Sequence, residues 1–289
     1  MKIFVVTKKT LIAGAAALLA VIAVIIIAVV CSKPKPQKGP QSGASKPVQS
    51  GEKVDPQSLS DPSEQYELEV LAGLMKEVPV YSISRPDKKI ALTIDAAWGD
   101  DKTEFIVKTL DKYNIKATFF LCGTWVKQYP DMVKLINEHG HEIGNHSLTH
   151  PHMSKLSASQ IQDELKALDN MLEPLTGGRT KLFRAPFGEY NDNVIKTARA
   201  AGYEVIQWNI DTVDWKECRS AQTILDTVIP KLKPGCVILC HNNASKIDKY
   251  LSVLIETALS EGYEFVTVSD LLLRGNTIID VNGVQKPIG

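Results

Sequence analysis

The chain has 289 residues, which is enough for one large domain with an additional segment, or for two small domains. Its hydrophobic content of 44% and charged content of 23% are ordinary for a globular protein, so a core of normal size can form. The formal net charge is +0, so the chain has no strong basic field to hold nucleic acid, and we expect no nucleic-acid partner.

The N-terminal residues predict a membrane anchor. Lysines at the start of the chain precede an unbroken apolar run at residues 11–30. A run of about 20 residues can cross a bilayer, and it exceeds the apolar region of about 7–15 residues in a secretory signal. Because the lysines are expected to stay cytoplasmic, we expect a single-pass membrane protein whose catalytic domain lies outside the cytoplasm. A cleaved signal peptide is the alternative, although Val29 and Val30 are larger than the residues that cleavage sites favour.

Composition divides the chain into five segments. Residues 1–31 hold the cytoplasmic lysines and the transmembrane anchor. Residues 32–60 are rich in Pro, Lys, Gln, Ser and Gly without an apolar period, which predicts a disordered spacer. Residues 61–87 form a stem with leucines at helical spacing. Residues 88–275 are expected to form a single α/β domain, and residues 276–289 a tail.

Short apolar, β-branched runs alternate with helical patterns from residue 88 onward. We expect strands at residues 90–95, 117–121, 141–145, 181–184, 204–209, 236–240 and 264–268. Strands separated by helices favour parallel pairing. The fold class is therefore α/β, and we expect a distorted, incomplete (β/α) barrel of about seven parallel strands as a single domain. A doubly wound open sheet is the alternative.

Local signals mark several helix ends. Asp101 with Glu104 predicts a capping box before an apolar helix. A second helix is predicted from the apolar residues Ile161, Leu165, Leu168 and Leu172, which recur at helical spacing. Glycines at 140, 202 and 262 lie where a helix should stop before the next strand.

Chemically capable side chains follow five of the predicted strands. Active sites in parallel α/β folds form at the carboxyl ends of the strands. The residues that fall there are Asp95, His146, Arg184, Asp211, Asp214 and His241. We therefore expect them to lie on one rim of the barrel.

Individual roles follow from residue type. His146 and His150 are four residues apart, and on a helical turn they would present two imidazoles to one divalent metal. Two unrelated loop histidines are the alternative. Asp95 closes an apolar strand and can act as a base for a water molecule, with Arg184 as its ion-pair partner. Asp214 can orient a histidine, and His241 follows a buried strand where a titratable group needs a partner.

The order and spacing of these residues resemble the polysaccharide deacetylases with a NodB-homology domain, carbohydrate esterase family four. The resemblance covers about residues 88–273 and five short motifs. The matching segments are Thr93-Ile94-Asp95-Ala96, His146-Ser147-Leu148-Thr149-His150, Arg184-Ala185-Pro186-Phe187-Gly188, Asp211-Thr212-Val213-Asp214-Trp215 and Leu239-Cys240-His241.

The resemblance implies a metal-dependent hydrolase that removes acetyl groups from a cell-wall polysaccharide, with peptidoglycan amino sugars favoured. It implies that Asp95 is the catalytic base, that Arg184 holds it, and that Asp214 tunes the general acid His241. His146 and His150 match metal ligands, with zinc favoured as the metal. The remaining positions concern substrate: the backbone N–H of Phe187 would help to bind the oxyanion, and Trp215 and Leu239 would wall the acetyl pocket.

One position departs from the family pattern. The family usually has a second Asp directly after the base, as a metal ligand, whereas this chain has Ala96. The segment Ala97-Trp98-Gly99-Asp100 resembles a sporulation-associated subgroup in which the same ligand is missing. We expect Asp95 to complete the metal site, with Asp100 or Asp101 as alternatives.

Two other functions compete with deacetylation. A catalytically weak or silent module that binds wall glycan is favoured by Ala96, and metal analysis would distinguish it. A hydrolase of another small amide or ester would use the same rim, and a substrate panel would decide.

Overall fold

The computed structural model describes residues 77–288 of the chain. The predicted anchor and spacer, and residues 61–76 of the predicted stem, lie outside the described residues. Within residues 77–288, no helix combines the length and the apolar character needed to cross a membrane.

A central sheet of parallel strands organises the domain. Its strand order is β6 (Glu204–Val205), β5 (Leu182–Phe183), β4 (Glu142–Asn145), β3 (Thr118–Leu121), β2 (Lys89–Ala96), β8 (Val237–His241) and β7 (Ile210–Asp211). A further short strand, β9 (Glu264–Phe265), pairs in parallel with the start of β2.

The sheet is curled into an incomplete barrel. Strands β6 and β7 lie at opposite ends of the strand order, yet only residues 206–209 separate them along the chain. Because four linking residues reach less than about 20 Å, the two edges of the sheet must approach each other. The Val80 backbone lies in the gap: its N–H donates to Val205 O (2.8 Å), and its carbonyl accepts from Gln207 N (2.7 Å). The predicted incomplete barrel is confirmed, and the open doubly wound sheet is wrong.

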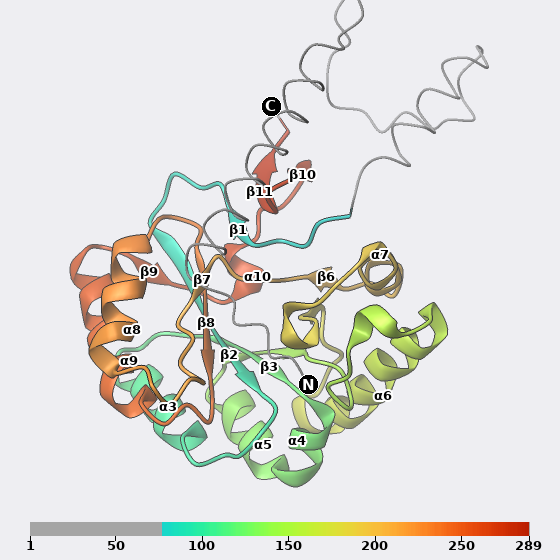
Figure 1. The fold of residues 1–289 in the computed structure, drawn as a ribbon, viewed down its shortest axis with the longest axis horizontal. Helices are drawn as coiled ribbons and strands as arrows, with labels where there is room; N and C mark the ends of the chain where they lie inside the picture. The colour runs from blue at the N-terminus through green and yellow to red at the C-terminus, as the bar shows by residue number, and fades with distance from the viewer. Residues whose placement is uncertain (1–76, 289) are drawn as a thin grey trace, which may run out of the picture. The chain divides into compact units, whose positions relative to one another are not determined.

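Helices cover the outside of the curled sheet (Figure 1). They are α3 (Thr103–Lys112), α4 (Gly123–Gln128), α5 (Pro130–Glu138), α6 (Ala158–Thr176), α7 (Asp192–Ala200), α8 (Ala221–Val228), α9 (Ile247–Ser260) and α10 (Val268–Leu271). The predicted apolar stripe of α6 is buried. Glycines at 140, 202 and 262 all have positive φ just beyond helix ends, as expected.

The alternation of side chains along the strands separates two cores. On β2, Ile90, Leu92 and Ile94 face the helices in the larger core. Ala91, on the other face, packs inside the barrel in a second apolar cluster with Phe120. Phe120 is the register partner of Asp95, so this inner cluster reaches the level of Asp95 in the sheet. On the same face of β2 as Ala91, the polar residues Thr93 and Asp95 follow toward the carboxyl end.

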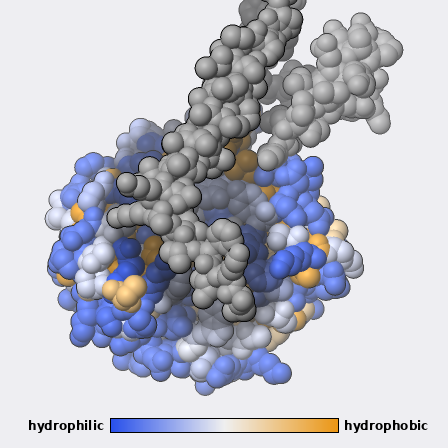
Figure 2. Space-filling model, viewed as in Figure 1, coloured by the Kyte–Doolittle hydropathy of each residue, from blue (hydrophilic) through white to orange (hydrophobic). Residues whose placement is uncertain are grey.

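A second, small sheet lies beside the barrel (Figure 1). It consists of β1 (Ser82–Ile83), β11 (Val284–Pro287) and β10 (Thr277–Ile279). Residues of the predicted stem and of the predicted tail therefore pair with each other. On the face shown in Figure 2, polar residues dominate and apolar residues form small separate patches, as is normal for a protein surface.

Two local predictions are wrong. The predicted strand at 204–209 is divided between β6 and the linker to β7, because residues 206–209 cross the gap between the sheet edges. The predicted capping box is absent from α3: the helix begins at Thr103, and its N-cap Lys102 makes no capping side-chain bond. Glu104 instead pairs with Lys108, one turn later on the same helix.

A buried carboxylate ties α6 to the sheet. Asp169 is 5% exposed, and its oxygens accept from Asn145 Nδ2 (3.1 Å), Arg179 Nε (2.7 Å) and Thr180 Oγ1 (2.6 Å). Tyr203 also donates to it. Asn145 ends β4, whereas Tyr203 directly precedes β6. Thr180 lies just before β5, so one side chain on α6 is bonded to residues beside three strands.

We predict that Asp169→Ala lowers the free energy of unfolding by about 3 kcal/mol, because it leaves several buried donors without their acceptor. Urea unfolding of the full chain in detergent would measure this. Asp163→Ala, at an exposed position of the same helix, is the matched control and should change stability by less than about 0.5 kcal/mol. Equal effects of the two substitutions would contradict the assignment.

Candidate active site

A buried ion pair stands at the carboxyl end of β2. Arg184 Nη1 donates to Asp95 Oδ1 at 2.7 Å and to Thr93 Oγ1 at 2.9 Å. Arg184 is 0% exposed and Asp95 is 6% exposed. Burial raises the pKa of the Asp95 carboxyl, but the charges of Arg184 and of nearby His146 outweigh this effect and hold its pKa below the ordinary value. Asp95 is therefore ionised and can accept a proton.

Aromatic rings and a backbone carbonyl fix the Arg184 guanidinium. It lies over the Phe120 ring at 4.1 Å and near the Trp208 ring at 5.4 Å. Its Nη2 donates to Gln207 O at 3.1 Å, in the linker that crosses the barrel gap. The planar guanidinium is thus held in one orientation, which in turn holds Asp95.

A second carboxylate orients His241. The His241 Nδ1 lies 2.8 Å from Asp214 Oδ1, and its backbone N–H donates to Asp214 Oδ2 at 3.1 Å. Tyr250, fully buried on α9, also donates to Oδ2. Burial lowers the pKa of His241, but its hydrogen bond with Asp214 and the charge of that carboxylate raise it above the ordinary value overall. His241 is suited to hold and release a proton near neutral pH.

The Asp95–Arg184 pair and the His241–Asp214 pair lie next to each other. Strands β2 and β8 are neighbours, and Asp95 is the register partner of His241. Adjacent strands lie about 4.8 Å apart, so a proton acceptor and a proton donor face the same small space. Asp211, also expected on this rim, ends β7, and its Oδ1 accepts from Val213 N at 2.7 Å.

The two motif histidines meet, but not through a helical turn. Residues 146–150 form an irregular loop in which Ser147 and His150 have positive φ (65° and 57°), so the helical argument for their spacing is wrong. The loop brings the His146 and His150 ring centroids to 4.9 Å. His146 Nδ1 lies 2.8 Å from Arg184 O, which can accept its N–H and so leave the Nε2 lone pair free.

The arrangement of His146 and His150 meets some of the requirements of a divalent metal site. Two imidazoles on one tetrahedral zinc, each bonded at about 2.0–2.1 Å, place their ring centroids about 5 Å apart. The buried Nδ1 of His150 also has no hydrogen-bond partner among the described residues. Within residues 77–288, however, no three His, Cys, Asp or Glu side chains converge to hold a metal. A third protein ligand from Asp95, Asp100 or Asp101 stays a prediction.

Ala96 occupies the position at which the resembled family usually has its third metal ligand. It is 0% exposed and belongs to the larger core, on the same face of β2 as Leu92 and Ile94. Asp95 faces the opposite side of the strand. The position that usually carries a metal-binding carboxylate is therefore filled by a small apolar side chain packed against the helices.

The remaining predicted residues surround this centre. Phe187 lies in a tight turn with φ of 60°, and its ring is 54% exposed. Trp215 is 57% exposed beside the buried Asp214. Leu239 is buried two residues before His241, so both side chains lie on the interior face of β8. The roles of these three residues toward substrate stay predictions.

Strained backbone is concentrated in these loops. Val213, a β-branched residue with φ of 51°, directly precedes Asp214. Such a conformation costs about 1–3 kcal/mol and persists only where the surroundings impose it. Together with Ser147, His150 and Phe187, it shows that the motif loops are held in uncommon conformations.

Sequence reasoning missed Tyr250 and Thr93 as supports of the site. Tyr250 lies on the buried stripe of α9, where its sequence context is that of a core aromatic residue. Thr93 lies two residues before Asp95 on the interior face of β2, and that spacing was a usable signal.

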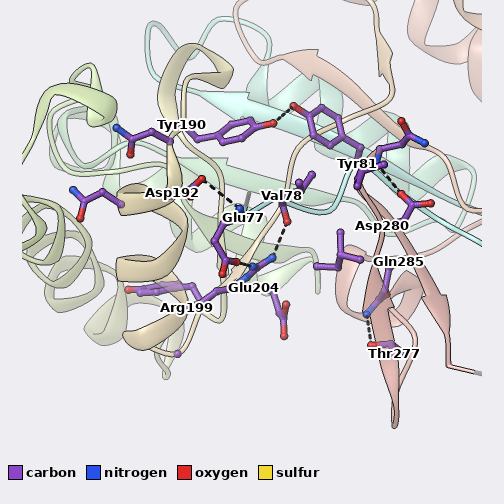
Figure 3. A pocket seen from close by; sticks show the side chains of 17 residues that line it. Glu77, Val78, Tyr81, Tyr190, Asp192, Arg199, Glu204, Thr277, Asp280 and Gln285 are labelled. Carbon is purple, nitrogen blue, oxygen red and sulfur yellow. Dashed lines mark hydrogen bonds and ion pairs between the residues drawn. The ribbon is translucent and has the colours of Figure 1, made fainter. Parts of the chain in front are cut away.

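A large cavity of about 1940 Å³ lies away from this centre, between α7 and the β10–β11 hairpin. None of the predicted catalytic or metal-binding residues lines it. Figure 3 shows that its polar groups interact with one another: Tyr81 and Tyr190 share a hydrogen bond of 3.0 Å, and Arg199 pairs with Glu77. We place the chemistry at the barrel rim, because the acid and base are there.

Known proteins with similar sequences point to one family. Residues 82–206 match the family described as Polysaccharide deacetylase. The chain is 37% identical over 201 residues to a peptidoglycan-N-acetylglucosamine deacetylase of Bacillus cereus, covering 66% of this chain and 71% of that protein. It is 36% identical over 196 residues to the uncharacterized protein YlxY of Bacillus subtilis, covering 67% of this chain and 60% of that protein.

Solved structures are also similar to this chain. A CE4 family pseudoenzyme from Bacillus anthracis superposes with a TM-score of 0.65 at 34% identity, covering 68% of this chain and 69% of that one. A mutant of the same protein is described as having restored enzymatic activity, with a TM-score of 0.65 at 36% identity over 68% of this chain and 72% of that one.

The site predicts a dependence of stability on pH. Burial lowers the pKa of His150 to about 4, from an ordinary value of 6.5. As the pH falls, the unfolded chain binds this proton first, so stability is complete above about pH 6.5 and is lost as the pH falls toward 4. We expect His150→Gln to lose less stability than wild type between pH 7 and pH 4.5, measured by urea unfolding. His152→Gln, on the same loop, is the control, and equal pH slopes for wild type and His150→Gln would refute the assignment.

Proposed function

The chain belongs to the polysaccharide deacetylase family, and from that premise we propose that it removes N-acetyl groups from the amino sugars of peptidoglycan. The observation that carries the proposal is a pair of supported proton-transfer groups in register: Asp95, which is paired with Arg184, lies on one strand, and His241, which is paired with Asp214, lies on the next. Hydrolysis of an amide needs one group to take a proton from water and another to give one to the leaving amine.

The residues divide this work as follows. Asp95 removes a proton from the attacking water, because Arg184 keeps its carboxylate ionised. The backbone N–H of Phe187 binds the oxyanion that forms on the acetyl carbonyl. His241, charged through Asp214, gives its proton to the departing nitrogen, so that acetate and a free amine leave. A divalent metal, with zinc favoured, would bind at His146 and His150, polarise the carbonyl and lower the pKa of the water.

The proposed substrate and location rest on different observations. The Bacillus cereus relative is a peptidoglycan-N-acetylglucosamine deacetylase, and a relative in Bacillus subtilis that is 32% identical over 191 residues is a peptidoglycan-N-acetylmuramic acid deacetylase. We therefore propose an amino sugar of the wall glycan as substrate. We also propose that the chain belongs to the sporulation-associated subgroup, which its segment Ala97-Trp98-Gly99-Asp100 resembles. The apolar run at residues 11–30 would anchor the domain outside the cytoplasm, where this polymer lies.

A second candidate is a glycan-binding module with weak or no catalysis. It is favoured by Ala96, by the lack of a three-ligand metal site within residues 77–288, and by the similarity to a CE4 family pseudoenzyme. Acetate release from isolated peptidoglycan, with and without added zinc, separates the candidates. Release that depends on metal supports the deacetylase, whereas binding of the polymer without release supports the module.

We predict that Asp95→Asn and His241→Ala each lower acetate release by about 100-fold or more, because each removes a proton-transfer group. Binding of peptidoglycan should change little. Circular dichroism of both variants would control for folding. A folded variant with near-normal turnover would show that its residue has no role in proton transfer.

We predict that Ala96→Asp binds zinc about tenfold or more tightly than wild type, because it supplies a carboxylate at the position where the resembled family usually has a metal ligand. The same substitution should destabilise the metal-free protein, since Ala96 is packed in the core and a new buried carboxylate has no partner there. Zinc titration and metal-free unfolding would measure both effects. Asp95→Asn completes the set: if wild type binds zinc tightly and Asp95→Asn binds it equally well, Asp95 is not the substitute ligand.

The proposed anchor predicts that the full-length protein stays in the membrane fraction at its full mass of 31.8 kDa. Alkaline washing should not release it, because an apolar helix of this length is held by the bilayer. A mature form that begins after residue 30 would show that the segment is a cleaved signal.

A further inference from the structure

Three aromatic side chains stand exposed on the loops around the acid–base centre. Within residues 77–288, Trp98 is 58% exposed, Trp215 is 57% exposed and Phe187 is 54% exposed. Each follows a different strand of the barrel at its carboxyl end: β2, β7 and β5. Exposing large rings to water is unfavourable, and their concentration around one site indicates a surface for a ligand.

Trp98 and Phe187 border the same histidine. The His150 ring centroid is 4.7 Å from that of Trp98 and 4.5 Å from that of Phe187, both in edge-on geometry. The Trp98 and Phe187 centroids are therefore at most about 9 Å apart. Phe187 also stacks on His152 at 4.7 Å. These rings form a continuous apolar margin beside the predicted metal ligands.

The loop that carries Trp98 is held in place by buried groups. The Gly99 carbonyl accepts from Trp125 Nε1 at 2.6 Å and from Asn242 Nδ2 at 2.7 Å, and both donor side chains are 1% exposed. On the other side of Trp98, the Ala96 carbonyl accepts from Cys122 N at 2.9 Å. The backbone is therefore fixed on both sides of an indole that remains in solvent. Such preorganisation lowers the entropy cost of binding.

We propose that Trp98 is a stacking residue for a sugar ring of the glycan chain, next to the sugar whose acetyl group reaches Asp95 and His241. The ligand class is a β-linked N-acetylated pyranose. One face of such a ring presents C–H groups, which pack on an aromatic ring, while its hydroxyls stay in water. This inference rests on the proposed function for the identity of the polymer. The backbone contacts that fix the Trp98 loop do not involve His146 or His150, so binding can be tested without metal.

Binding measured without turnover tests the proposal. The full chain in detergent micelles, with EDTA present, is titrated calorimetrically with the tetrasaccharide of β-1,4-linked N-acetylglucosamine. Trp98→Ala should weaken binding about tenfold, and Trp98→Phe should retain affinity within about threefold of wild type because it keeps a ring. Phe105→Ala, which removes a 36% exposed ring from α3, is the matched control and should bind as wild type does. Thermal unfolding should be unchanged in Trp98→Ala, since its loop is held through the backbone.

Each outcome has one meaning. Wild-type affinity in Trp98→Ala, or no binding of the tetrasaccharide by wild type, overturns the proposal. A loss of affinity shared equally by Phe105→Ala also overturns it, because the effect is then not local to the rim. If Trp98-dependent binding is found but no acetate is released with any metal, the stacking role stands and the proposed deacetylation fails. If acetate is released but Trp98→Ala binds normally, the proposed deacetylation stands and the stacking role fails.

Discussion

The Arg184 guanidinium is the group on which the rest of the site depends. A cation with no exposed surface is tolerated only when its charge is compensated. Its compensation is Asp95, the proposed base, and a further donor reaches Gln207 O in the linker that crosses the barrel gap. Its own backbone carbonyl lies within hydrogen-bonding distance of His146. The requirement to neutralise one buried charge thus fixes the base, ties the site to the closing segment of the barrel and orients a predicted metal ligand.

Because side chains alternate between the two faces of β2, the residues that build the core differ from those that face the site. Residues facing the helices build the larger core, whereas Thr93 and Asp95 face the interior and the chemistry. Ala96 belongs to the helix-facing set, so its small apolar side chain supports the core while it withholds a metal ligand. A member of this family can therefore lose metal affinity without losing its barrel.

Much of this site could be predicted from the sequence, because strand ends carry strong local signals. Buried runs such as residues 90–95 end at a polar residue, and parallel pairing brings those ends together. The failures concern what local patterns do not contain. The division of residues 204–209 depends on the curl of the whole sheet, and the meeting of His146 with His150 depends on two residues with positive φ. Nothing local distinguishes Tyr250 from a core tyrosine, since its partner Asp214 is 36 residues away.

The energetics of burial favour an active site over a purely structural remnant. Asp214 is 1% exposed, and it is held by His241, by Tyr250 and by the strained loop at Val213. Buried charged pairs often contribute little to stability, because desolvation offsets their attraction, and apolar replacements are frequently as stable. A barrel that only bound glycan would gain little from two such pairs placed in register. The exposed rings of Trp98 and Trp215 suit binding alone, but they do not require an ionised base beside a histidine whose pKa is raised. The arrangement therefore supports the proposed proton transfer, whereas the proposed metal site has no cluster of three protein ligands within residues 77–288.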